Sequence, residues 1–258
     1  MQLTFRPIYC LITVSILKIV SFNGVFITIA LATFMNSARS EDACYVPRVV
    51  YYTTYDCLED GVIVIAEGTK KGFANERGVM VVPLRYDFVR YFQEGLSAVE
   101  LNEKWGFVDK QGNTIIANQY SEVLDVQNER IGVRKDEKWR FIDKSGKRIT
   151  DFIYDEANDF SEGLAAVKQH NKWGFINKSG KTVIPLNYDE ALSFSEDFAA
   201  VKLNHKWGFI DKTGKVALEL EYGDAAGFYG GLAYVQYEDE WVYINKQGQI
   251  IDSPLLGN

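Results

Sequence analysis

Hydrophobic and polar positions alternate in short runs through residues 163–196, and glycine or polar residues separate the runs. Residues 164–169 form the first strand candidate and residues 182–184 the third. Between them Trp173 and Phe175 are two positions apart, so in a strand both side chains lie on one face. The pattern predicts three short β-strands joined by tight turns.

The rest of this segment, residues 188–196, contains two aromatic residues, Tyr188 and Phe194, among polar ones. Its pattern fits either a fourth short strand or an irregular connection. Nowhere between residues 41 and 258 do apolar residues recur with the helical period of 3.6. The sequence therefore predicts an all-β protein.

The same pattern recurs along the chain with a constant spacing of 34 residues and no insertion. All five tryptophans follow this spacing, and so do a series of five tyrosines and a series of five glycines in predicted turns: Trp105, Trp139, Trp173, Trp207, Trp241; Tyr86, Tyr120, Tyr154, Tyr188, Tyr222; Gly112, Gly146, Gly180, Gly214, Gly248. Because several residue types share one period, the chain contains a genuine internal repeat. We count six antiparallel β units, beginning near residues 61, 95, 129, 163, 197 and 231.

Two arrangements of the six units remain open, an open twisted solenoid and a closed propeller-like ring. Residues 52–60 are similar to the last third of a unit, which the sixth unit lacks, so the N-terminal segment could complete that unit and close a ring. Against closure, each unit shows three clear strands, whereas a propeller blade has four. An open array with capped ends fits equally well.

A glycine follows most of the tryptophans, as in Trp173-Gly174. A tryptophan ring buries a large area, and a glycine lets a ring or a backbone from the adjacent unit approach closely. We therefore expect the five tryptophans to form the core of the repeat rather than a ligand site. Arg140 and Val242 replace this glycine in units three and six, so we expect no such close approach there.

Residues 1–40 contain no acidic residue, and an apolar run from Ile19 to Met35 is followed by Ala38-Arg39-Ser40. Small residues such as Ala38 and Ser40, three residues and one residue before the cut, are typical of a signal-peptide cleavage site, which favours export to the periplasm, the cell envelope or the extracellular space. The alternative is an uncleaved membrane anchor, since the run is nearly long enough to span a bilayer. The predicted division is a signal peptide at 1–40, an N-terminal segment at 41–60 and a repeat domain at 61–258.

Without its first 40 residues the chain has 25 basic and 35 acidic residues, a net charge of −10. This charge disfavours a nucleic-acid partner and docking on an anionic membrane surface. Two cysteines remain, Cys44 and Cys57, which could form one disulfide in an oxidising compartment. The alternative is a pair of reduced thiols.

The repeated segments resemble the WG-repeat family of bacterial proteins. The resemblance rests on Lys172-Trp173-Gly174-Phe175-Ile176-Asn177-Lys178-Ser179-Gly180-Lys181, its counterpart at 206–215, the preceding residues 160–167 and the following residues 183–189. It covers roughly residues 61–253. It implies a β-rich repeat fold in proteins that are often exported, and it supplies no catalytic residue.

The residues for catalysis or metal binding are few. The two histidines, His170 and His205, stand where other units have any polar residue, which indicates a solvated turn. An acidic or amide residue begins each glycine turn and could suggest calcium, but a lysine always follows it, so hydrogen bonding within the turn explains it better: Asp109, Asp143, Asn177, Asp211, Asn245. No nucleotide, zinc or serine-hydrolase motif is present, so we predict no cofactor and no metal.

The leading functional hypothesis is a non-catalytic scaffold that binds a protein or peptide. The alternative is a carbohydrate or cell-wall binding module, because repeated aromatic side chains also suit sugar stacking. The two hypotheses predict different exposure of the aromatic rings. Rings of Tyr86, Tyr154, Tyr188 and Trp173 open to solvent in a row would favour sugar, and buried rings would favour packing.

Overall fold

The structure is a computed structural model, and it describes residues 21–22, 25–26, 53–54 and 61–251. The predicted signal peptide and Cys44 and Cys57 therefore lie outside the described residues, apart from two short paired strands, β1 (Ser21–Phe22) and β2 (Val25–Phe26). No helix long and apolar enough to cross a membrane occurs in the part of the chain that the structure describes.

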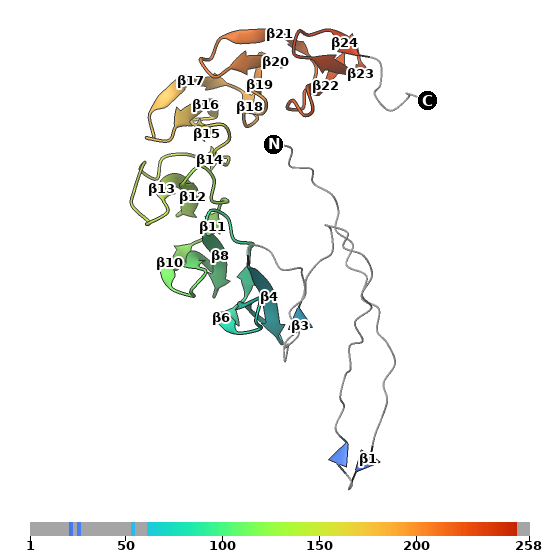
Figure 1. Cartoon of the computed structure of the whole chain (residues 1–258). Helices are drawn as coiled ribbons and strands as arrows, with labels where there is room; N and C mark the ends of the chain where they lie inside the picture. The colour runs from blue at the N-terminus through green and yellow to red at the C-terminus, as the bar shows by residue number, and fades with distance from the viewer. Residues whose placement is uncertain (1–20, 23–24, 27–52, 55–60, 252–258) are drawn as a thin grey trace.

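Six antiparallel sheets follow one another along the chain (Figure 1). The first contains β3 (Thr53–Thr54), β4 (Val62–Glu67), β5 (Lys70–Asn75) and β6 (Met80–Tyr86); the second β7 (Phe88–Val89), β8 (Leu96–Leu101), β9 (Lys104–Asp109) and β10 (Thr114–Tyr120). The third contains β11 (Glu122–Val123), β12 (Arg130–Lys135) and β13 (Lys138–Asp143); the fourth β14 (Glu156–Ala157), β15 (Leu164–Gln169), β16 (Lys172–Asn177) and β17 (Thr182–Tyr188). The fifth contains β18 (Glu190–Ala191), β19 (Phe198–Leu203), β20 (Lys206–Asp211) and β21 (Val216–Tyr222); the sixth β22 (Leu232–Tyr237), β23 (Glu240–Asn245) and β24 (Ile250–Ile251). The all-β prediction with 34-residue antiparallel units is confirmed.

In the first four units, the connection at the end of the unit contains a short strand that pairs with the next sheet; in the fifth unit a single bridge, Ala225 to Val235, takes its place. In the fifth sheet, Ala191 of β18 lies opposite Val201 of β19. Four of the six sheets are therefore four-stranded, and the objection that a unit supplies only three strands is wrong. The sequence pattern could not distinguish a strand from an irregular connection in this segment, because two residues are too few to show an alternation of apolar and polar positions.

In the second to sixth sheets, the hairpin that joins the two middle strands is closed by two residues with positive φ. In the fourth sheet these are His170 (φ 51°) and Asn171 (φ 60°). Positive φ at both central positions is the geometry of a type I′ turn, whose twist matches that of the paired strands. Short polar side chains tolerate this conformation better than bulky ones. The two histidines thus occupy turns, as predicted.

The hydrophobic core lies between successive sheets rather than inside one unit. A cluster that includes Trp173, Phe175 and Tyr188 of the fourth sheet also contains Val201 and Ile210 of the fifth. The same arrangement joins the third sheet to the fourth and the fifth to the sixth. A single sheet cannot bury its large aromatic residues alone, so neighbouring sheets stabilise one another.

The sheets follow an open arc whose first and last members lie at opposite ends (Figure 1). The short strands β11, β14 and β18 lie on the inner side of the arc, and β10, β17 and β21 lie on the outer side (Figure 1). Of the predicted ring-closing segment, only Thr53–Thr54 is described, and it pairs with β4 of the first sheet, not with the sixth. The remainder of that segment lies outside the described residues.

Hydrogen bonds with a spacing close to the repeat join neighbouring units. Ser195 Oγ donates to the carbonyl of Phe228 at 2.5 Å, and Ser161 Oγ donates to the carbonyl of Phe194 at 2.6 Å. Glu196 accepts a hydrogen bond from the backbone N–H of Gly231 at 3.0 Å. These bonds satisfy backbone groups of the loops between sheets and fix the position of each sheet on the next.

Candidate functional site

The tryptophans differ in exposure according to their place in the array. Trp139, Trp173 and Trp207 are buried, and Trp105 is half-buried. Trp241 is 46% exposed, so its assignment to the core is wrong. The fifth sheet packs over Trp173, but no sheet of the described residues follows the sixth to pack over Trp241 in the same way.

The glycine after tryptophan accommodates the outer strand of its own sheet. A Cβ at Gly174 would lie 2.6 Å from the carbonyl oxygen of Ile184, far inside van der Waals contact. The strand pairing shows the cause: Trp173 lies opposite Tyr188 and Phe175 opposite Ile184, so three residues of β17 bulge over one residue of β16. The expectation that this glycine admits a neighbouring unit is therefore wrong, because the approaching backbone belongs to the same sheet.

The third unit, where Arg140 replaces the glycine, lacks a regular outer strand. Only isolated bridges remain, between Trp139 and Tyr154 and between Ile142 and Arg148. The Arg140 guanidinium stacks on the ring of Phe152, 4.2 Å from its centroid. The outer segment of the same sheet is therefore irregular in this unit; the expected loss concerned a neighbouring unit, whose backbone does not approach the corresponding glycine of the fourth sheet either.

The five turn glycines all have positive φ, between 76° and 85°: Gly112, Gly146, Gly180, Gly214 and Gly248. The residue that begins each turn binds backbone N–H groups through its side chain. Asp211 Oδ1, for example, accepts from the N–H groups of Thr213 at 2.8 Å and Lys215 at 3.1 Å. The hydrogen bond from the Thr213 hydroxyl, together with these bonds, holds the pKa of Asp211 below its usual value. This carboxylate is therefore used within the turn, and calcium is not needed to explain it.

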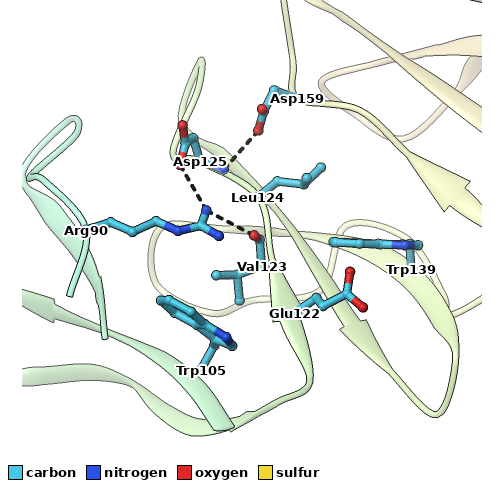
Figure 2. Close-up of a pocket in the computed structure, with 8 residues that line it drawn as sticks. All are labelled: Arg90, Trp105, Glu122, Val123, Leu124, Asp125, Trp139 and Asp159. Atoms are coloured by element: carbon cyan, nitrogen blue, oxygen red, sulfur yellow. Dashed lines mark hydrogen bonds and ion pairs between the residues drawn. The ribbon is translucent and has the colours of Figure 1, made fainter. Parts of the chain in front are cut away.

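A pocket of about 310 Å³ lies on the boundary between the second and third sheets (Figure 2). Its wall is contributed by three successive sheets and consists of Arg90, Trp105, Glu122, Val123, Leu124, Asp125, Trp139 and Asp159. Arg90 follows the short strand β7, Glu122 and Val123 form β11, and Asp159 follows β14. The pocket thus lies next to short strands, which run along the inner side of the arc (Figure 1).

A departure from the repeat accompanies this pocket. In the fourth sheet Lys168 pairs with Glu156 at 2.6 Å and lies over the ring of Trp173, 5.9 Å from its centroid. Lys202, Glu190 and Trp207 repeat this arrangement in the fifth sheet. In the second sheet Glu100 takes the place of that lysine, so the ring of Trp105 lacks this cover.

Arg90 covers Trp105 instead and also ties the pocket together. Its guanidinium carbon lies 4.8 Å from the centroid of the Trp105 ring. Its Nη1 donates to Asp125 Oδ1 at 3.1 Å and to the carbonyl of Val123 at 3.2 Å, and Figure 2 shows both contacts. Arg90 is therefore held by an aromatic face, a carboxylate and a backbone oxygen at once.

Asp125 and Asp159 occupy the same repeat position in adjacent units, 34 residues apart. The backbone N–H of Asp125 donates to Asp159 Oδ1 at 2.9 Å, as Figure 2 shows. Burial, followed by repulsion from the Asp125 carboxylate, raises the pKa of Asp159 to about 6. Asp159 is thus a partly buried carboxylate whose charged form is costly at neutral pH.

The sequence prediction missed this pocket because it searched the repeated positions. Leu124, Asn158, Leu192 and Ala226 stand at the position of Arg90 in the other units, and Tyr91, Ser193 and Gly227 stand at the position of the two aspartates. The signal in the sequence was therefore a group of residues in neighbouring units that differ from the residues at the same positions of most other units.

Comparisons with known proteins give a family and a fold. The model of the WG containing repeat matches residues 72–105, 105–139, 139–173, 173–207 and 207–241. No curated protein matches the chain.

Among solved structures, a eukaryotic initiation factor is similar with a TM-score of 0.53 and 11% identity over 74% of this chain; the chain spans 62% of that protein. Hsv2p of Kluyveromyces lactis is similar with a TM-score of 0.45 and 12% identity, covering 76% of this chain and 74% of that one. The C-terminal WD40 domain of Sif2 is similar with a TM-score of 0.41 and 10% identity, covering 72% and 64%. At these identities only the fold is shared. Since the five consecutive matches of the repeat cover most of the chain, it belongs to the family of WG-containing repeat proteins.

Proposed function

We propose that this chain is an exported, non-catalytic scaffold that binds a protein or peptide through the pocket between its second and third sheets. One observation carries the proposal. The side chains that repeat hold the sheets together, whereas the side chains that break the repeat, Arg90, Asp125 and Asp159, gather around one pocket. A scaffold of repeats needs uniform residues for packing and variable residues for recognition.

The exposure of the aromatic rings favours a protein or peptide over a carbohydrate. Tyr86, Tyr154, Tyr188 and Trp173 are all buried, so they form no row of open rings on which sugars could stack. Exposed aromatic rings occur at two separate places, Phe88 and Tyr91 near β7 and Tyr229, Tyr234 and Trp241 around the sixth sheet, where Trp241 stacks on Tyr234 with centroids 4.9 Å apart. A carbohydrate-binding role would rest on these separate places and not on a row of repeated rings.

A photo-crosslinking amino acid placed at Glu122 of the full chain tests the proposal. Glu122 lines the pocket, and its side chain is 52% exposed. Glu190 occupies the same repeat position two units later and is 53% exposed, which makes it a matched control outside the pocket. We expect a discrete protein or peptide adduct from position 122 and none from position 190.

Equal adducts at both positions would overturn the pocket as the binding site. No adduct at position 122 together with retention on a glycan array would overturn the proposal in favour of carbohydrate binding. Export is tested separately. We expect the secreted chain to begin at Glu41, the first residue after the predicted cut between Ser40 and Glu41.

A further inference from the structure

The pocket contains more negative than positive charge. Its wall has three carboxylates, Glu122, Asp125 and Asp159, and one cation, Arg90. Two of the three carboxylates already have a cationic partner. Glu122 forms an ion pair with Arg134, and Asp125 forms one with Arg90.

Asp159 is the carboxylate without a cationic partner. Its hydrogen bond comes from a backbone N–H group, that of Asp125, and none of the described residues forms an ion pair with it. Arg90 attracts its charge from a distance, but the Arg90 guanidinium is itself paired with Asp125. The geometry makes its charge costly, because the Asp125 carboxylate is its neighbour in the pocket and protein covers most of its surface. A partly buried carboxylate of this kind is normally neutralised by a cation.

We infer that the pocket receives a positively charged side chain, lysine or arginine, of the bound protein or peptide, and that Asp159 pairs with it. The inference rests on the proposed function and gives the chemical class of the ligand. Unit two supplies no lysine at this position, because Glu100 stands where units four and five have one. In those units the lysine of the same chain already bridges an acidic residue and a tryptophan ring.

Two other ligand classes fit less well. An anion would meet three carboxylates, and the Arg90 guanidinium that could attract it is already bound to Asp125, Val123 and the face of Trp105. A sugar would need an open ring face. The face of Trp105 is covered by Arg90, and Trp139 is buried.

The test uses Nα-acetyl-lysine amide as the probe and the indole N–H signals of the full ¹⁵N-labelled chain as the readout. We expect saturable shifts of the Trp105 and Trp139 signals, because both rings line the pocket. Nα-acetyl-norleucine amide, which has a side chain of nearly the same length and no charge, should leave both signals in place. Asp159→Asn should weaken binding by about tenfold, as expected for loss of a hydrogen-bonded charge partner.

Asp151→Asn serves as the control, since Asp151 forms an exposed ion pair with Arg148 outside the pocket. This variant should bind the probe as the parent chain does. Binding should also weaken as the pH falls below about 6, where Asp159 takes up a proton beside Asp125 and Arg90. Equal shifts with both probes, or binding that Asp159→Asn leaves unchanged, would overturn the inference.

The two proposals fail in different ways. A partner that crosslinks at position 122 equally well with Asp159→Asn would support the scaffold and overturn the cationic ligand. Saturable binding of the lysine probe with no adduct at position 122 would support the cationic site and overturn the scaffold.

Discussion

Trp173 and Trp241 occupy the same repeat position 68 residues apart, yet Trp173 is 8% exposed and Trp241 is 46% exposed. The fifth sheet covers the first ring, and no described sheet covers the second. We expect Trp173→Ala to lower the free energy of unfolding by about 3–5 kcal/mol, the usual cost of truncating a buried tryptophan. Trp241→Ala should cost less than about 1 kcal/mol, as for surface substitutions. Urea unfolding of both variants measures this difference, and equal losses would contradict the packing between sheets.

Gly174 tests the bulge of the outer strand. Gly174→Ala places a Cβ 2.6 Å from the carbonyl oxygen of Ile184, so β17 must move away from β16. We expect a loss of about 2–3 kcal/mol, within the range for overpacking. Hydrogen exchange should also become faster within residues 182–188. Gly227→Ala is the control, because its Cβ would meet only Ser195, at 3.8 Å. Unchanged exchange in β17 would show that the glycine has another role.

Asp159 makes stability depend on pH in a defined direction. Its pKa is raised to about 6 in the folded chain, so the folded state binds more protons than the unfolded state between about pH 4 and 6. Stability due to this group is therefore lost as the pH rises through that range and stays lost above it.

We expect Asp159→Asn to raise the free energy of unfolding at pH 7.5 by about 1–2 kcal/mol, after allowance for solvent screening. Near pH 4 the substitution should change little. Denaturation at both pH values measures the effect. The variant would then be more stable and yet bind the lysine probe less well, a combination that mere misfolding cannot produce.

The hydroxyl of Ser195 tests the contacts between units. It donates to the carbonyl of Phe228 in the next connection at 2.5 Å, so Ser195→Ala should cost about 1 kcal/mol. Because each sheet contacts only its neighbours, we expect faster hydrogen exchange in the sixth sheet and unchanged exchange in the second. A uniform increase along the whole chain would instead indicate one cooperative unit.

The sequence was sufficient for the fold and insufficient for the site, for a physical reason. Trp173 and Phe175 repeat because every sheet must bury the same rings against its neighbour, so their period shows in the sequence. The short strand β18 pairs only two residues, which is too few for a pattern. Asp125 and Asp159 meet because consecutive units place the same position side by side, and a search for shared residues passes over positions where most units differ.

The exposure of the five indole rings tests the central claim most directly. In a full chain labelled with 5-fluorotryptophan, the shift of each ¹⁹F signal on transfer from H₂O to D₂O reports contact with solvent, and single Trp→Phe variants assign the signals. We predict almost no shift for Trp139, Trp173 and Trp207, an intermediate shift for Trp105 and a large shift for Trp241. Five equally large shifts would contradict the account, because the rings could not then hold the sheets together.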